Sequence, residues 1–377
     1  MVTKFVPYPA NAGGRIRSLA ILRRLLDQGE VVLCCFDDGS SDAAELRRLG
    51  IDVRTVPWDT SVPNVVRGIA KAHSGSAGRF WDRRLAALVR RACAEQPADL
   101  LQVEYSQLAP YLDVGSARLK VLDFHNIESS LALSFARSSR ELKAWLAYPE
   151  SVLLRRLEKK GAERADLVLV VSEEDRQRLP GRPREVLVCP NGWDPGEVLP
   201  ASTEPVAAFV ALMGWKPNSD AAVWLAREVW PLVRASVPDA RLLLVGREPG
   251  RVVTDLAAPD IEVTGTVPEI APYLQQSMVA LAPLLSGGGT RLKVLEALNS
   301  GRPLVSTSVG IDGLTDLIGK GVFVGDSPAD FAKEIVDLFG DPERARKAGL
   351  EGAEAARTHY SWDGTLRSWS ERISRLK

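Results

Sequence analysis

The chain has 377 residues, 45% of them hydrophobic and 25% charged, which is the composition of an ordinary globular protein and excludes collagen-like and disordered chains. Lys and Arg together number 48, as do Asp and Glu, so the net charge is zero and no overall positive field attracts nucleic acid. The length favours two domains. We therefore expect a two-domain protein that has no nucleic-acid partner.

Short apolar runs alternate along the first half with segments whose apolar residues recur at helical spacing, such as Leu19, Leu22 and Leu26. This alternation is typical of parallel sheets built from βαβ units. The clearest predicted strands are residues 30–36, 51–57, 99–104, 120–124, 166–172 and 185–189.

A second series of strands follows, at residues 207–213, 241–246, 261–267, 278–284, 303–307 and 322–325. Between the two series, residues 192–205 are rich in Pro and Gly and have no periodicity, as expected of a linker. We predict an α/β protein of two tandem, doubly wound Rossmann-like domains, 1–195 and 196–360. A last helix, 361–377, is predicted to cross back to the first domain with Trp362, Leu366, Trp369 and Ile373 buried.

Neither the four cysteines nor the ends of the chain indicate a secreted or membrane-spanning protein. Cys34, Cys35, Cys93 and Cys189 lack metal-ligand spacing and are predicted to be reduced core residues. No secretory leader opens the chain, and no apolar run approaches the roughly 20 residues that span a bilayer. These features predict a cytoplasmic protein.

The glycine-rich segment 286–296 is the sharpest chemical signal. It follows an apolar strand and leads into a helix, so backbone N–H groups and the positive end of the helix dipole favour a phosphate or diphosphate there. Arg291 and Lys293 would add positive charge. Glu296 lies on a helix that is otherwise predicted to be buried, where a carboxylate needs a polar partner such as a ribose hydroxyl. The alternative is a plain strand-to-helix turn with solvated basic residues.

This segment resembles the retaining nucleotide-sugar glycosyltransferases of family 4, which have the GT-B fold with two domains facing across a cleft. Their helix carries two glutamates eight positions apart; Glu296 matches the second, which binds ribose, whereas Gly288 stands at the first. The resemblance implies that His125, after strand 120–124, contacts the donor sugar, and that Arg291 and Lys293 stabilise the leaving diphosphate. The donor-binding residues would be Gly13, Gly14, Gly214, Lys216, Gly246, Arg247, Thr266, Val267, Gly287, Gly288, Gly289, Thr290 and Glu296.

The resemblance implies transfer of a sugar from a nucleotide-diphosphate sugar with retention of configuration, to a small-molecule, saccharide or lipid-linked acceptor on the first domain. No Asp-x-Asp motif ends a predicted strand, so we expect no metal and no other cofactor. A nucleotide-sugar epimerase of similar fold and a non-catalytic partner subunit that binds nucleotide sugars stay open. A dehydrogenase is disfavoured because no Gly-x-Gly-x-x-Gly fingerprint follows the first strand.

Residues 79–91 form a predicted basic amphipathic helix with Phe80, Trp81, Leu85, Leu88 and Val89 on its apolar face. Such a helix can lie on the anionic inner face of a membrane or guide a lipid-linked acceptor. Packing of the apolar face against its own domain is the other interpretation.

Overall fold

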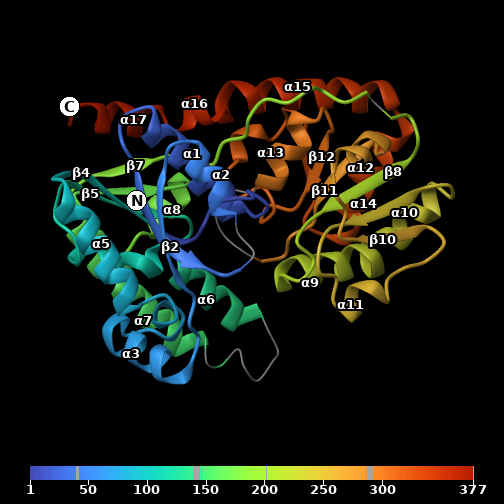
Figure 1. Cartoon of the computed structure of the whole chain (residues 1–377). Coiled ribbons are helices and arrows are strands. Elements are labelled where there is room, and N and C mark those ends of the chain that lie inside the picture. Colours follow the sequence, from blue (N-terminus) through green and yellow to red (C-terminus); the bar gives the residue numbers. More distant parts are fainter. Residues whose placement is uncertain (40–41, 139–144, 146, 201, 287–291, 377) are drawn as a thin grey trace. The chain divides into compact units, whose positions relative to one another are not determined.

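A computed structural model describes residues 1–39, 42–138, 145, 147–200, 202–286 and 292–376 (Figure 1). The contacts divide the chain into two compact units. The first unit consists of Met1–Pro190 together with Leu366–Lys377, and the second of Asn191–Thr365. Both units have a parallel sheet covered by helices, which confirms the predicted fold class.

The first unit contains a seven-stranded sheet in the order β3-β2-β1-β4-β5-β6-β7, in which all pairs are parallel. Its strands are β1 (Val2–Phe5), β2 (Val32–Asp37), β3 (Asp52–Pro57), β4 (Ala98–Glu104), β5 (Ala117–Phe124), β6 (Leu167–Val170) and β7 (Val186–Val188). Its helices are α1 (Gly13–Leu26), α2 (Ala43–Arg48), α3 (Val62–Ala72), α4 (Gly75–Gly78), α5 (Arg83–Glu95), the 3₁₀ helix η1 (Ser106–Asp113), α6 (Glu128–Ser138), α7 (Ala147–Arg164), α8 (Glu173–Arg178) and α17 (Arg367–Ser374).

The second unit contains a six-stranded parallel sheet in the order β10-β9-β8-β11-β12-β13. Its strands are β8 (Val206–Val210), β9 (Arg241–Val245), β10 (Ile261–Gly265), β11 (Val279–Ala282), β12 (Leu304–Ser306) and β13 (Val322–Val324). Its helices are α9 (Lys216–Trp224), the π-helix η3 (Leu225–Val229), α10 (Trp230–Ser236), α11 (Arg251–Thr254), α12 (Ala271–Gln276), α13 (Leu292–Asn299), the 3₁₀ helix η4 (Thr315–Leu317), α14 (Pro328–Gly340), α15 (Pro342–Tyr360) and α16 (Trp362–Thr365).

The strands form where the sequence has short apolar runs, because a sheet covered on both faces buries consecutive side chains. All four residues of β6 and all four of β11 are buried. The twelve predicted strands are all present, most of them shorter than predicted. The residues that follow a strand leave the sheet early and form loops at its carboxyl edge, where ligands bind in folds of this type.

The end of the chain is two short helices rather than one. The break falls at Leu366, between α16 and α17. Trp362 lies in the second unit, against Gly192. Leu366, Trp369 and Ile373 are buried in the first unit.

Residues 79–91 are not one helix, because Asp82 caps the start of α5 and only Arg83 onward is helical. Leu85 and Val89 are buried, and Phe80, Trp81 and Leu88 pack against the same core. The apolar face therefore packs against its own unit, as in the second interpretation. No helix in the described part of the chain is both long and apolar enough to cross a membrane.

Candidate functional site

Both sheets reverse their strand order at one point, and the predicted site residues follow strands at or near these points. In the first unit β1 lies between β2 and β4, and in the second unit β8 lies between β9 and β11. A crevice at the carboxyl ends of the strands is the usual ligand site at such a switch point. The two groups of residues are described separately.

In the first unit, His125 follows β5 and is buried beside the end of β4. Its Nε2 lies 2.8 Å from Glu104 Oε2, and its ring stacks on Tyr105 with 3.8 Å between the ring centroids. The amide of Gln102 donates to the other oxygen of Glu104, at 2.8 Å. The carboxylate of Glu104 thus fixes the Nε2 edge of the imidazole, and the ring of Tyr105 covers one of its faces.

Arg17, on the buried side of α1, connects the ends of β5 and β7 next to His125. Its Nε and Nη2 donate to the two oxygens of Asp123 at 2.7 and 2.9 Å, and its Nη1 donates to the carbonyl of Cys189 at 2.9 Å. Such a bidentate pair fixes both planar groups. Because Asp123 is the second-last residue of β5 and lies two residues before His125, the pair also fixes the backbone that presents the imidazole.

Burial controls the protonation of this cluster. It lowers the pKa of His125 to about 3, against the opposite effect of Asp123 and with smaller contributions from Arg17 and Lys4, so the imidazole is neutral near pH 7. Burial also raises the pKa of Glu104 to about 7 and that of Asp123 above its ordinary value, although Arg17 acts in the opposite direction on both. A neutral imidazole can donate or accept one hydrogen bond to a sugar hydroxyl.

Glu104, Asp123 and His125 are also the one group in the described residues whose oxygen and nitrogen atoms lie close enough together to hold a metal ion. However, both oxygens of Asp123 accept from Arg17, and Nε2 of His125 is hydrogen-bonded to Glu104. A cation would have to displace the guanidinium from a fully buried ion pair. The donor set therefore fits a hydrogen-bonded cluster better than a metal site.

The predicted Gly13-Gly14 loop begins α1, next to this cluster. A β-carbon at Gly14 would overlap the hydroxyl of Tyr105, so the glycine allows the tyrosine ring to approach α1 closely. Tyr105 itself has φ 71°, a left-handed conformation that is uncommon for a bulky residue. The N-cap residue of α1, Ala12, makes no side-chain hydrogen bond to the first N–H groups of the helix.

In the second unit, the predicted loops after β8 and β9 lie against each other. Gly246 has φ 145°, and a β-carbon there would overlap the carbonyl of Ala211. The backbone N–H of Met213 donates to the carbonyl of Arg247 at 2.9 Å, beside the exposed Gly214. After β10, Thr266 is exposed, whereas Val267 packs on the sheet. These contacts give the carboxyl edge a fixed shape.

Lys293, at the start of α13, is directed to α9. Its Nζ donates to Asn218 Oδ1 at 2.6 Å and lies 5.2 Å from the centroid of the Phe209 ring. Asn218 in turn donates to the carbonyl of Leu212 at 2.8 Å. Lys216, expected to approach the donor phosphates, pairs with Asp220 at 2.9 Å on its own helix.

Glu296 lies one turn after Lys293 on the same side of α13. The two residues line a small pocket together with Ala208 and Val210 of β8 and Ala280 of β11. Burial raises the pKa of Glu296 to about 7. Among the described residues, none donates a hydrogen bond to the carboxylate of Glu296 or forms an ion pair with it. The carboxylate is half-buried and lies beside β8, at the switch point of the second sheet.

Some predicted residues lie outside the described part of the chain, namely Gly287, Gly288, Gly289, Thr290 and Arg291. Sequence analysis gave no role to Arg17 or Asn218. The sequence does hold a signal for Arg17: it lies four positions before Ile21, so both residues are on the buried side of α1, where an arginine needs an acidic partner. Asn218 is the residue that holds Lys293, and no sequence pattern joins positions 75 residues apart.

Two family models match the sequence. The model described as glycosyl transferase 4-like domain matches residues 12–192, and that described as glycosyl transferases group 1 matches residues 204–341. Each match coincides with one unit of the structure. The chain belongs to the GT-B glycosyltransferases. An uncharacterized 44.6 kDa protein in the cps region of Klebsiella pneumoniae is 24% identical over 138 residues, which span 36% of that curated relative.

Solved structures of glycosyltransferases have the same fold as this GT-B chain. Sucrose-phosphate synthase from Thermosynechococcus elongatus superimposes with a TM-score of 0.74 at 16% identity, over 100% of this chain and 98% of that one. HepE of Anabaena in complex with UDP gives a TM-score of 0.68 at 16% identity, over 99% of both chains. At this identity the likeness concerns the fold.

Proposed function

We propose that the chain transfers a sugar from a uridine-diphosphate sugar to an acceptor, with retention of anomeric configuration and without a divalent cation. Family membership supports the reaction class, and the complex of HepE with UDP supports the base. Retention follows from the resemblance to family 4. The acceptor is assigned to the first unit and is not identified further.

Glu296 is the observation that carries the proposal. Its carboxylate is half-buried at the switch point of the second sheet, with a raised pKa and with no partner among the described residues. Burying a carboxylate without a hydrogen-bond donor is costly, so such a group is retained where a ligand supplies donors. The two hydroxyls of a ribose fit this requirement.

The other residues take roles that follow from their chemistry. Lys293 stabilises the negative charge that grows on the diphosphate as the glycosidic bond breaks, together with Arg291 and the N–H groups of residues 287–290. Neutral His125 hydrogen-bonds the donor sugar, with its tautomer and orientation set by Glu104. A phosphate oxygen of the donor takes the proton of the acceptor hydroxyl, so that the hydroxyl proton replaces the sugar on the leaving diphosphate.

Nucleotide binding tests the donor site directly. Calorimetry with UDP, GDP and ADP on the wild type and on Glu296→Gln should show tightest binding of UDP and a loss of about ten-fold or more in the variant, because a charge-assisted hydrogen bond contributes about 1.5–3 kcal/mol. Glu354→Gln, which changes an exposed glutamate of the same unit, is the matched control. Equal affinity of both variants and wild type would remove the support from Glu296.

Donor hydrolysis without acceptor tests catalysis and stereochemistry. Incubation with UDP-glucose should release glucose slowly, and proton NMR should detect the α-anomer first if configuration is retained. Release of the β-anomer first would contradict retention. Tight UDP binding without any turnover of UDP-sugars would instead favour the non-catalytic partner subunit.

A further inference from the structure

Helix α3 has an exposed apolar stripe, in which Val62 and Val66 point away from the unit and Ile69 borders α4 at Gly78. Val62, Val66 and Ile69 recur at positions i, i+4 and i+7, and their exposed fractions are 75%, 58% and 38%. Trp58, just before the helix, is 38% exposed. The side of α3 that faces the unit carries the small buried residues Gly68 and Ala72. A surface helix of a globular protein normally has the opposite arrangement, with its large apolar side chains inward.

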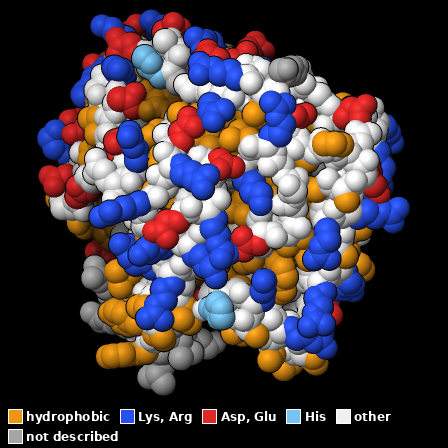
Figure 2. Space-filling model, turned by 90° about the vertical axis from the view of Figure 1, so that its left-hand side faces the viewer, with side chains coloured by type: hydrophobic (Ala, Val, Ile, Leu, Met, Phe, Trp, Pro, Cys, Tyr) orange, Lys and Arg blue, Asp and Glu red, His pale blue; other side chains and the backbone are white. Residues whose placement is uncertain are grey.

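The sequence around this stripe is strongly basic, although the whole chain is neutral. From Trp58 to Glu95 the chain has seven Lys and Arg residues, at 67, 71, 79, 83, 84, 90 and 91, and three acidic residues, Asp59, Asp82 and Glu95. Asp82 is buried and bonded to Arg84. Figure 2 shows hydrophobic and basic side chains next to each other along the lower edge of this face. An apolar stripe with a basic surround is complementary to the headgroup region of an anionic bilayer.

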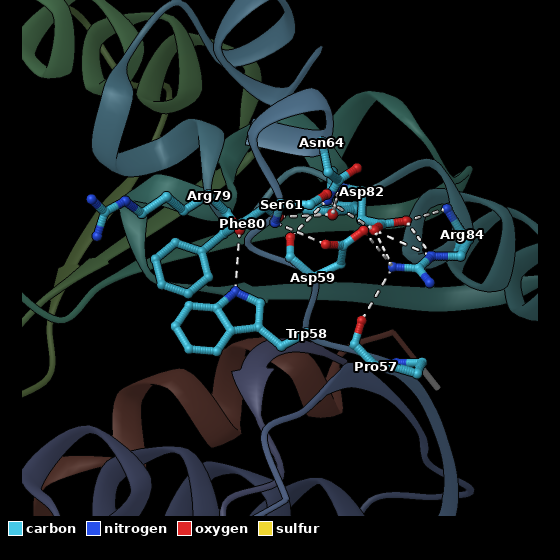
Figure 3. A network of polar contacts seen from close by, with 10 residues as sticks. Pro57, Trp58, Asp59, Ser61, Asn64, Arg79, Phe80, Asp82 and Arg84 are labelled. Carbon is cyan, nitrogen blue, oxygen red and sulfur yellow. Dashed lines mark hydrogen bonds and ion pairs between the residues drawn. The ribbon is translucent and has the colours of Figure 1, made fainter. Parts of the chain in front are cut away.

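The stripe is held in place by a polar network (Figure 3). Asn64, on the inner side of α3, donates to the carbonyl of Asp59 at 2.9 Å and to Asp82 Oδ2 at 3.3 Å. Trp58 donates from Nε1 to the carbonyl of Arg79 at 3.2 Å and stacks on Phe80 with 5.9 Å between the ring centroids. The position of α3 therefore does not depend on burial of its apolar stripe.

Close backbone packing fixes the same side of the helix. A β-carbon at Gly68 would overlap the carbonyl of Gly78, so α3 and α4 are in contact through their glycines. Ser74, Gly75 and Ser76 at the start of α4 are bonded to Glu150 of α7. With its inner side occupied by this contact, α3 has only its outer side available to a partner.

We propose that α3 and Trp58 dock the protein on an anionic membrane surface. Val62, Val66 and Ile69 enter the boundary between headgroups and acyl chains, while Arg67, Lys71 and Arg79 contact lipid phosphates. The three apolar residues span about 10 Å along the helix, which suits shallow insertion of a helix lying parallel to the surface. This surface adjoins residues 79–91, because Trp58 contacts Arg79 and Phe80, but Leu85 and Val89 of that segment are buried in the core.

Vesicle flotation of the full chain tests the proposal. The wild type should float with vesicles of phosphatidylcholine and phosphatidylglycerol, but not with phosphatidylcholine alone, and salt should weaken the binding by screening. The affinity of the triple variant Val62→Ser, Val66→Ser, Ile69→Ser for the vesicles should fall by about ten-fold or more, because the apolar contribution is lost. Arg67→Gln and Lys71→Gln should each lower the partition coefficient about five-fold.

Val252→Ser is the matched control, because Val252 in the second unit is 55% exposed, close to the value for Val66. It should float like the wild type, and all variants should melt like the wild type since the sites are exposed. Failure of the wild type to float with anionic vesicles would overturn the proposal, as would flotation of the triple variant at the wild-type level. A wild-type dimer that this variant dissociates, measured by light scattering, would assign the stripe to a second copy and also overturn it.

Discussion

Replacement of Lys293 by Met keeps most of the side-chain length and removes the charge. The Nζ of Lys293 lies 2.6 Å from Asn218 Oδ1, so the variant leaves a buried amide oxygen without its charged donor. The loss of a charge-assisted hydrogen bond costs about 1.5–3 kcal/mol, which lowers the melting temperature of a domain of this size by roughly 3–10 °C. If Lys293 also stabilises the departing diphosphate, donor hydrolysis should fall by about 10² to 10³.

The two roles of Lys293 are separated by a second variant. Asn218→Ala breaks the same hydrogen bond but keeps the positive charge, so it should lower stability similarly and retain most of the turnover. Lys333→Met removes a solvent-exposed lysine that pairs with Asp337 at 2.7 Å, and it should change neither property measurably. The assay is turnover of UDP-glucose below the melting temperature, with UDP affinity measured by calorimetry. A Lys293→Met variant with the turnover of Asn218→Ala would refute the catalytic role.

Four further outcomes are expected. Donor hydrolysis should continue in excess EDTA, and a loss that manganese or magnesium restores would contradict metal independence. Gly246→Ala should destabilise the second unit by about 1–3 kcal/mol and weaken UDP binding, because its β-carbon meets the Ala211 carbonyl, whereas Gly250→Ala, with open space around it, should not. Trp369→Ala should lower the free energy of unfolding of the first unit by about 3–5 kcal/mol, and with it the melting temperature, since this side chain is fully buried. If the variant unfolds like the wild type in calorimetry, α17 contributes little to stability. The pKa of Glu104 is raised to about 7 in the folded chain from about 4.5. The contribution of this carboxyl group to stability is therefore present below about pH 5 and lost by about pH 8. Denaturant titrations should show that the wild type loses stability relative to Glu104→Gln over this range.

The strands and helices could be predicted from the sequence because each depends on a local pattern of apolar and polar residues. All twelve predicted strands are present, since short apolar, β-branched runs fit a sheet that is covered on both faces. The position of His125 after β5 was likewise predictable, because strand ends can be read from the point where apolar residues stop. The resemblance to the family singled out Gly14 and Gly246, and the structure adds the neighbours that a β-carbon would meet there, Tyr105 and Ala211.

The tertiary structure alone decided which side chains meet. Arg17, Glu104, Asp123 and His125 come from α1, β4, β5 and the loop after β5, and their ion pair and hydrogen bonds exist because parallel strands end at the same edge of the sheet. The direction of each amphipathic face was also decided at this level. Segment 79–91 and helix α3 both have apolar residues at helical spacing, yet the first is buried and the second is exposed. Periodicity states that a helix has an apolar side, but the packing of Gly68 on Gly78 determines which side of α3 faces the core.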